Sequence, residues 1–344
     1  MKSTIRISLI VSLLWFICIG MLPQAAAEEK TIIFGAYTVP KDAYEQEVIP
    51  AFIKYWKEKT GQTVKFEQSY EASGAQSRAI AAGMGADIAA LSLEKDISRL
   101  KDAGLITHDW KNNKYHGFVT NSLVVIVYRP GNPKNIKEWD DLKRPDVDVL
   151  YPSPKTSGGA MWDVNAIYGA GLKLSEVKTG KKDYTFAKDL LKGVQKRVKV
   201  MDKSGRASVT TFEQGIGDVL VTYEDEALLR KKQGKDFPFL IPESTILIEN
   251  PIAVIDKNVD KHNTRQIAEA FLEFVHTARA QRLFAQYGLR PVVDDVVPEF
   301  KEKFPVPPYL FDMSYLGGWD KVETEIYGKD GIWTKIIQEL ATDK

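Results

Sequence analysis

The feature that most constrains the fold is a repeated unit in which a β-like run ends in a turn of small residues and a helical pattern follows. The clearest unit surrounds residues 151–162, which read YPSPKTSGGAMW. An apolar run with strand character precedes this stretch, and the residues after its two glycines have the spacing of a helix: Ala160, Trp162, Val164, Ile167 and Tyr168. The alternation of strand, turn and helix predicts a doubly wound α/β fold.

The turn within this stretch has the chemistry of an anion-binding site. Ser157 is a suitable helix N-cap, and Gly158 and Gly159 leave their backbone amides open to the close approach of a ligand. Such amides are unpaired donors at the positive end of the helix dipole. An ordinary capped helix with a glycine turn has the same local sequence, so this turn alone does not decide between the two interpretations.

Three further turns share this design, and each follows a β-like run and precedes a helical segment. They are built on Tyr37-Thr38, on Ser73-Gly74 and on Ser204-Gly205. Ligands of doubly wound sheets bind outside the carboxyl ends of the strands. Four such turns therefore predict a cleft into which several helix N-termini converge.

The rest of the chain continues the alternation of strands and helices. Strands are expected at residues 31–34, 64–66, 86–91, 122–128, 147–150, 218–223 and 246–255. Helices are expected at residues 44–56, 76–82, 95–103, 135–142, 210–215, 264–284 and 333–340. The acidic run at residues 224–226 is expected to be a solvated helix start.

The first residues have the pattern of an export signal. Lys2 and Arg6 precede an apolar run at residues 7–22, and three alanines at residues 25–27 provide a cleavage site. We expect a signal peptide at residues 1–27 with cleavage after Ala27, which implies a periplasmic protein. The single cysteine lies inside the apolar run, so the exported chain would have no disulfide, thiol catalyst or cysteine-ligated metal.

The charge balance excludes several classes of partner. The chain has 47 basic and 46 acidic residues, and the expected signal peptide holds two of the basic ones and no acidic one. A net charge near zero gives no basic footprint for nucleic acid or for a membrane surface. If the protein binds an anion, a local arrangement of donors must hold it.

A secreted serine-dependent hydrolase is the main alternative from another class. Its nucleophile would be Ser73 or Ser157, and either would need a nearby base. The four histidines have neither triad spacing nor metal-ligand spacing relative to these serines: His108, His116, His262 and His276. We therefore predict no catalytic residue, no metal and no cofactor.

Four longer motifs resemble one family closely. They are PKTSGGAMW at residues 154–162, TTFEQGIGDVL at 210–220, YEDEA at 223–227 and GNPKNIKEWDDL at 131–142. The chain resembles the sulfate- and thiosulfate-binding proteins of ABC transporters, a group of the type II periplasmic solute-binding proteins. The resemblance implies a two-lobed α/β fold with a ligand cleft between the lobes, a permease as partner and no enzymatic activity.

The resemblance also implies which residues bind the ligand, all of them neutral hydrogen-bond donors. The positions are Thr38, Ser73, Ser157, Gly158, Gly159, Gly205 and Tyr223. The family's pattern gives Ser73 the role of donor through both its amide and its hydroxyl. At Thr38 and Tyr223 this chain departs from the pattern, which usually has an aspartate and a tryptophan there.

These departures bear on the choice of anion. Sulfate carries no proton at neutral pH and needs donors only, whereas hydrogen phosphate also needs an acceptor. The hydroxyls of Thr38 and Tyr223 can do both, and Glu71 could accept if it turned toward the cleft. We expect sulfate or thiosulfate as the ligand, with molybdate and phosphate as alternatives, and we expect a helical Glu71 that faces solvent.

The donor positions divide between two expected lobes. Residues 28–120 and 247–344 are expected to form one lobe, and residues 121–246 the other, with crossing segments near residues 120–122 and 242–250. Because donors lie on both lobes, ligand binding should close the cleft by a hinge motion. The protein is expected to be a monomer.

Overall fold

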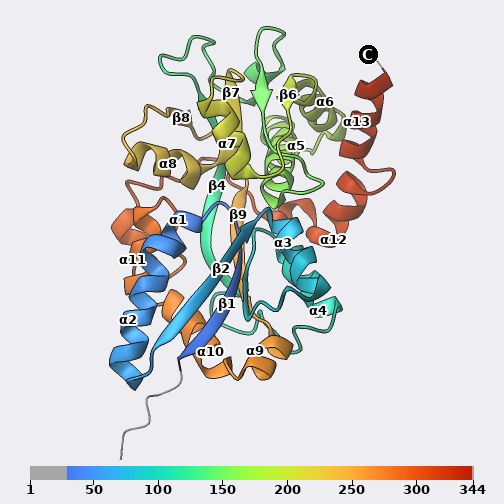
Figure 1. Ribbon diagram of the computed structural model, residues 1–344. Helices are drawn as coiled ribbons and strands as arrows, with labels where there is room; N and C mark the ends of the chain where they lie inside the picture. Colours follow the sequence, from blue (N-terminus) through green and yellow to red (C-terminus); the bar gives the residue numbers. More distant parts are fainter. Residues whose placement is uncertain (1–28, 343–344) are drawn as a thin grey trace, which may run out of the picture.

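The computed structural model describes residues 29–342 and shows two α/β halves that share one sheet (Figure 1). The strand order is β2-β1-β3-β9-β4-β7-β5-β6, and β8 pairs with β4. The strands are β1 (Lys30–Tyr37), β2 (Val64–Glu71), β3 (Ile88–Ala90), β4 (Phe118–Tyr128), β5 (Val149–Leu150), β6 (Val198–Val200), β7 (Val219–Tyr223), β8 (Phe239–Leu240) and β9 (Leu247–Val254). The expected signal peptide lies outside the described residues.

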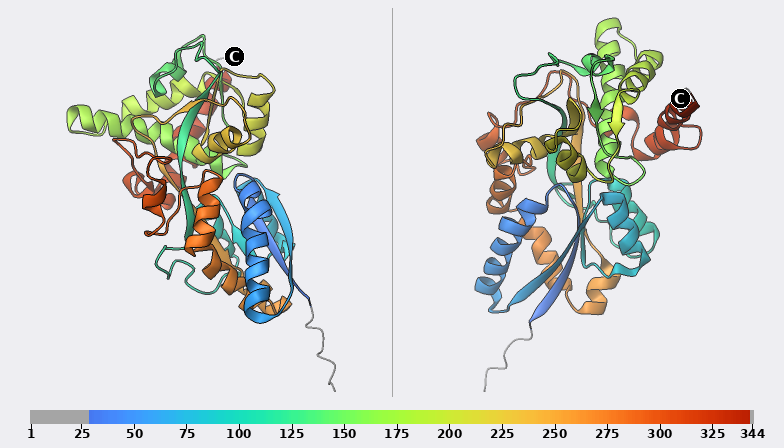
Figure 2. Two further views of the ribbon diagram at one scale, coloured as in Figure 1. Left: turned by 90° about the vertical axis from the view of Figure 1, so that its left-hand side faces the viewer. Right: turned by 45° about the horizontal axis from the view of Figure 1, so that its top comes forward.

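Helices cover both faces of the sheet in each half, as the two views of Figure 2 show. They are α1 (Lys41–Ala43), α2 (Ile49–Thr60), α3 (Ser73–Ala79), α4 (Glu94–Asp102), α5 (Gly158–Thr179), α6 (Tyr184–Gln195), α7 (Gly205–Glu213), α8 (Glu224–Lys232), α9 (Asp256–His262), α10 (Arg265–Val275), α11 (Ala278–Gln286), α12 (Trp319–Val322) and α13 (Ile332–Thr342). Among the described residues, no helix is long and apolar enough to cross a membrane.

Alternation along the strands of the first half builds its two apolar layers. Ile32, Phe34 and Ala36 of β1 lie in a core with residues of α2, α10 and α11. Ile33 points to the opposite face, where it packs against a core that includes residues of α4. Since β1, β2 and β3 are parallel, their carboxyl ends lie at the same edge of the sheet.

The second half has the same two-layer construction. Val124 and Ile126 of β4 lie in a core with residues of α5 and α6, whereas Val125 and Val127 lie in a core with residues of α7. β5, β6 and β7 are parallel to one another, and β7 pairs antiparallel with β4. The carboxyl end of β7 leads directly into α8.

Two long strands join the halves. β4 pairs with β9 through residues 118–123 and with β7 through residues 124–128. β9 in turn pairs with β3 at its carboxyl end. The crossing segments expected near residues 120–122 and 242–250 therefore include the paired part of these strands.

The C-terminal part of the chain divides between the halves. α10 and α11 contribute to the core that contains β1. By contrast, Trp319, Val322 and Trp333 lie in the core that contains α5 and α6. The last helices thus pack on the second half and not, as expected, with the N-terminal part; the lobe boundaries as a whole remain a prediction.

Most expected elements are present, with several local differences. The helix expected at residues 264–284 is two helices, because α10 ends at Val275 and Thr277 caps a new helix, α11. The helix expected at residues 135–142 is only a short 3-10 turn, η3 (Trp139–Lys143). The pattern did not predict α6, α9, α12, β6 or β8.

Candidate functional site

The Ser157 turn is the N-terminus of α5. Ser157 is the N-cap, and its hydroxyl oxygen accepts a hydrogen bond of 3.3 Å from the Ala160 amide. The amides of Gly158 and Gly159 precede the first intrahelical bond and remain available as donors. A side chain at Gly158 would place its Cβ 2.7 Å from the Ser92 hydroxyl of the first half, so only glycine fits without a shift.

Ser73 begins α3, but its hydroxyl has partners already. It donates to the Asp96 carboxylate at 2.6 Å and accepts from the Ser92 amide at 2.9 Å. A hydroxyl has one proton to donate, so in this conformation only the Ser73 amide is free for a ligand. The hydroxyl instead ties the start of α3 to the loop before α4.

Gly205 begins α7 and lies beside the loop that contains Thr38. The Ser204 hydroxyl caps this helix by accepting from the Ala207 amide at 3.2 Å. A Cβ on Gly205 would lie 3.4 Å from a methyl group of Val39. Thr38 directly precedes Val39 and is half-buried, so the two predicted donors come from neighbouring turns of opposite halves.

Tyr223 is the last residue of β7 and contacts residues of both halves. Its hydroxyl is hydrogen-bonded to the Ser92 hydroxyl at 2.6 Å, and its ring lies 3.7 Å from the Cβ position of Gly159. The ring of Tyr37 approaches it edge-on, with 6.3 Å between ring centroids. Burial raises the pKa of Tyr223 well above its usual value, so the hydroxyl keeps its proton and can donate it.

Ser92 is a central residue that the sequence analysis missed. It is fully buried at the carboxyl end of β3 and contacts Ser73, Tyr223 and the Gly158 turn. Its carbonyl also accepts from the Trp162 indole at 2.9 Å. A serine directly after a strand is the same signal as in the other turns, but without a glycine it was not recognised.

Arg206 lies next to Gly205 and joins the two halves. Its guanidinium donates to the Asp42 carboxylate at 2.7 Å, to the Val39 carbonyl at 2.9 Å and to Glu226 at 2.8 Å. Burial alone would lower the pKa of Arg206. Glu226 and Asp42 outweigh burial and raise this pKa above its ordinary value. The cation is therefore balanced by two carboxylates and holds the Thr38 loop in place.

The acidic residues after Tyr223 correct an expectation. Glu224, Asp225 and Glu226 start α8 as expected, but all three are buried and not solvated. Their partners are, in order, Arg290, Ser122, and the pair Arg206 and Arg230. Burial of charge requires such partners. Arg230 lies one helical turn after Glu226, whereas Ser122, Arg206 and Arg290 lie far away in the sequence.

Glu71 differs in detail from expectation, and Lys155 borders the Ser157 turn. Glu71 ends β2 and is not helical, although its side chain is exposed as expected. Lys155 is exposed beside the Ser157 turn. It lines a cavity of about 70 Å³ between the halves, together with Gly74, Arg78, Lys95, Ser157 and Gly158.

Three of the histidines bond to groups other than the predicted donor residues. The His108 ring bonds to Asp256 and the His262 ring to Asp87, whereas His276 bonds to backbone carbonyls. Within residues 29–342, no group of three or more histidine, cysteine or acidic side chains could hold a metal ion. The candidate nucleophiles Ser73 and Ser157 bond to a carboxylate, to backbone amides and to no histidine.

The fold and the site together define the class of protein. The family model for bacterial extracellular solute-binding proteins matches residues 37–290. The chain belongs to this family of bacterial extracellular solute-binding proteins.

Three relatives place the chain more closely. It is 41% identical to the sulfate-binding protein of Synechococcus elongatus over 89% of this chain and 86% of the relative. It is 33% identical to the thiosulfate-binding protein of Pseudomonas aeruginosa over 92% of this chain and 94% of that protein. The structure of the sulfate-binding protein SubI from Mycobacterium tuberculosis matches with a TM-score of 0.79 and 38% identity, over 87% of this chain and 99% of SubI. The match confirms the expected two-lobed α/β fold class.

Proposed function

We propose that the protein binds sulfate or thiosulfate between its two halves and delivers the anion to an ABC importer. The observation that carries this proposal is the meeting of helix N-termini from both halves at the Ser157 turn. Ser92 and Tyr223 join these turns through one hydrogen bond of 2.6 Å. The names of the relatives, which are sulfate- and thiosulfate-binding proteins, support the choice of anion.

The proposed site holds the anion with neutral donors alone. The donors are the amides of Thr38, Ser73, Gly158, Gly159 and Gly205 and the hydroxyls of Ser157 and Tyr223. An uncompensated buried dianion costs tens of kcal/mol, and each hydrogen bond to a charged group returns about 1.5–3 kcal/mol. Each helix dipole adds about 0.3–1 kcal/mol, so the full set offsets much of the cost.

The state of Tyr223 favours an anion without a proton. Ser92 can donate to the Tyr223 oxygen, which leaves the tyrosine proton free for the ligand. Burial raises the pKa of Tyr223, so this proton is retained over the physiological pH range. Sulfate can accept a hydrogen bond from the Tyr223 hydroxyl and has no proton of its own. Hydrogen phosphate carries a proton and would also require a hydrogen-bond acceptor in the site.

The contacts between the halves fit a closed binding protein. Trp162 donates to the Ser92 carbonyl, and Arg206 donates to Asp42 across the same boundary. β4 and β9 are the continuous connections about which the halves would open. We further propose that the protein is exported through residues 1–27, acts as a monomer in the periplasm and docks on a permease in its closed form.

Calorimetric titration of ligand-stripped protein tests the anion. Sulfate, thiosulfate, molybdate and phosphate are titrated at pH 6 and pH 8. We expect sulfate or thiosulfate to bind more tightly than phosphate at both values. Phosphate binding that exceeds sulfate binding, or that follows the protonation of phosphate, would contradict the assignment and indicate an acceptor in the site.

Two variants test the turn itself. Ser157→Ala removes a hydroxyl donor and Gly159→Pro removes an amide donor, in a helix turn that tolerates proline. Thr277→Ala is the matched control, because Thr277 caps α11 through a bond of the same 3.3 Å length to Ala280. We expect both turn variants to weaken sulfate binding and the control to leave it unchanged; unchanged affinity in both would remove this turn from the site.

A further inference from the structure

Asp163 is a buried carboxyl without a partner, directly beneath the Ser157 turn. It lies four residues after Gly159, so both residues are on the same face of α5. Its side chain is 1% exposed. Neither carboxyl oxygen has a hydrogen-bond partner among residues 29–342.

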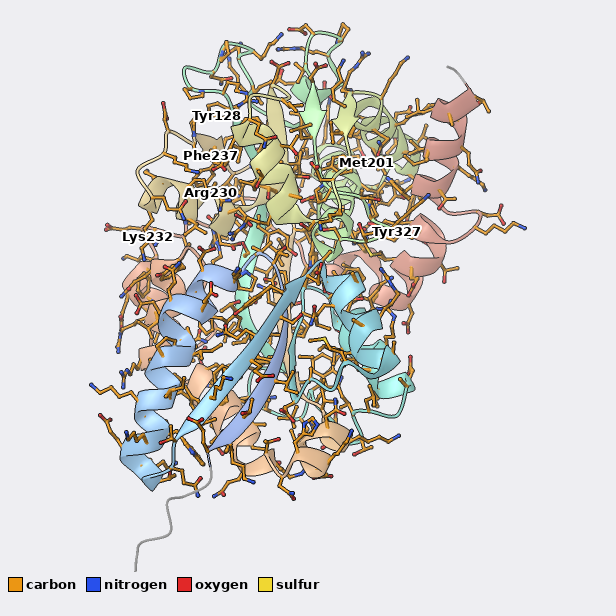
Figure 3. All side chains as sticks on the ribbon, in the orientation of Figure 1. Tyr128, Met201, Arg230, Lys232, Phe237 and Tyr327 are labelled. Carbon is orange, nitrogen blue, oxygen red and sulfur yellow. The ribbon has the colours of Figure 1, made fainter. Side chains whose placement is uncertain are left out.

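Three tyrosines from three other segments interact electrostatically with this carboxyl: Tyr223 at the end of β7, Tyr151 after β5, and Tyr327 in η6 (Glu323–Tyr327). Tyr327 is labelled in Figure 3, near the C-terminal helices. All three hydroxyls have other partners, namely Ser92 for Tyr223, Gln195 for Tyr151, and the Met161 carbonyl with Asn165 for Tyr327.

No charged neighbour compensates an ionised Asp163. Burial is the cause of the raised pKa of this carboxyl, and no cation of residues 29–342 counteracts it. Asp96 and Asp225 act on Tyr223 and would add further negative charge on that side. Burial raises the pKa of Asp163 well above its usual value, because an isolated buried carboxylate is very costly.

We infer that Asp163 is held as a neutral carboxylic acid beneath the anion turn and that its ionisation opposes anion binding. The inference rests on the proposed function, because it assumes that the anion binds at the N-terminus of α5. An ionised Asp163 would lie about 6 Å along the helix axis from Gly159. It would repel the ligand and interact with the same positive end of the helix dipole.

Proton uptake on binding follows from this arrangement. Sulfate itself does not titrate above pH 5, so a pH dependence must come from the protein. If the anion binds only when Asp163 is neutral, affinity falls up to tenfold per pH unit above the pKa of Asp163 in the free protein. Binding at such a pH takes up about one proton.

The test compares wild type with Asp163→Asn, which keeps the shape and cannot ionise. Sulfate is titrated calorimetrically from pH 5 to pH 9.5 in buffers of different ionisation enthalpy. We expect the wild-type affinity to fall and proton uptake to appear at the alkaline end. Asp163→Asn should bind like wild type at pH 5, with constant affinity and no proton uptake.

A matched control removes another carboxyl group whose pKa is raised. Burial, together with Asp312 and Glu94, raises the pKa of Glu249 on β9 to about 7. Glu249→Gln should keep the alkaline loss of affinity if Asp163 is its source. An alkaline loss that disappears in Glu249→Gln and persists in Asp163→Asn would overturn the inference.

An infrared measurement separates this inference from the proposed function. A protonated carboxylic acid gives a carbonyl band, which should be present in ligand-free wild type at pH 7 and reduced in Asp163→Asn. If neither protein binds sulfate at any pH, the proposed function and the coupling both fail, while the band still reports the neutral acid. Absence of the band difference, a flat wild-type affinity, or a folded Asp163→Asn that has lost sulfate binding at pH 5 would overturn the inference.

Discussion

The two halves supply donors to the candidate site in different ways. In the second half, Ser157 and Ser204 cap α5 and α7 by accepting from backbone amides of their own helices. In the first half, α3 has no side-chain cap, and the Ser73 hydroxyl donates to Asp96 while it accepts from Ser92. The same residue type therefore performs two different tasks.

The difference shows how a hydroxyl becomes available to a ligand. A serine that only accepts from its own helix keeps its O–H proton for another acceptor, whereas a serine that donates to a carboxylate does not. The second half thus offers both amides and hydroxyls. The first half offers amides, and its Ser73 hydroxyl fixes the start of α3 to the loop before α4.

The largest effect is expected where the two halves come closest. In Gly158→Val the first side-chain carbon alone would lie 2.7 Å from the Ser92 hydroxyl, which should prevent closure. We expect sulfate affinity to fall about 100-fold, or roughly 2.7 kcal/mol. Gly205→Ala is the comparison, since its Cβ would lie 3.4 Å from Val39. This variant should lower the affinity for sulfate by less than about tenfold. Equal calorimetric affinities for these two variants would contradict the closed arrangement.

The next effect separates the two kinds of serine. Ser157→Ala removes a proposed hydrogen bond to a charged ligand and should weaken sulfate binding by about 10- to 100-fold. Ser73→Ala leaves the buried Ser92 amide without its acceptor and removes one partner of the buried Asp96 carboxylate, which keeps its pair with Arg99. This substitution should lower the free energy of unfolding by about 1–3 kcal/mol, measured by urea denaturation. It should lower the affinity for sulfate by less than about fivefold. If Ser73→Ala lowers the affinity for sulfate as much as Ser157→Ala does, the two hydroxyls do not differ in role.

A smaller effect is expected from the arginine that joins the halves. Arg206→Gln removes the pair with Asp42 and the support of the Val39 carbonyl, while Glu226 keeps Arg230. Sulfate affinity should fall about tenfold, because the closed form loses about 1.4 kcal/mol. Arg282→Gln, which breaks an exposed pair with Glu299, is the control and should bind sulfate like wild type. A full retention of affinity in Arg206→Gln would show that this contact does not stabilise closure.

The smallest effect concerns the strands between the halves. Burial raises the folded-state pKa of Glu249 to about 7, whereas an unfolded glutamate titrates near 4.3. Between these values the folded state binds more protons, so stability falls as pH rises through this window and then levels off. Relative to Glu249→Gln, the unfolding free energy of wild type should fall by about 1 kcal/mol from pH 4.5 to pH 7, after allowance for solvent screening. Parallel stability curves for the two proteins would show that Glu249 titrates normally.

Local patterns accounted for most of the elements. The spacing of Tyr44, Val48, Phe52, Tyr55 and Trp56 predicts one helical face; four of these side chains are buried and Tyr55 is half-buried. Serine and glycine after a strand predicted that helices follow, but α3 and α7 begin within these turns, at Ser73 and Gly205, and not at residues 76 and 210 as expected. These signals act over a few residues, because a cap or a buried face is set by its immediate neighbours.

Such local patterns did not predict which distant residues form ion pairs or pack together. The acidic residues 224–226 were expected to be solvated, but their arginine partners come from α7, from α8 itself and from the segment after α11. The packing of α12 and α13 on the second half depends on which core can cover Trp319 and Trp333. Charge and hydrophobicity say that such residues need partners and do not say which ones.

The sequence by itself determined the α/β class, the donor chemistry of the turns and, through its motifs, the family. Only the tertiary structure decided that Ser92 joins Ser73 to Tyr223, that the Ser73 hydroxyl is committed to Asp96, and that Asp163 is buried without a partner. The physical reason is that capping and helix periodicity are local properties of the chain. Burial and hydrogen-bond partnership instead depend on which distant segments fold against one another.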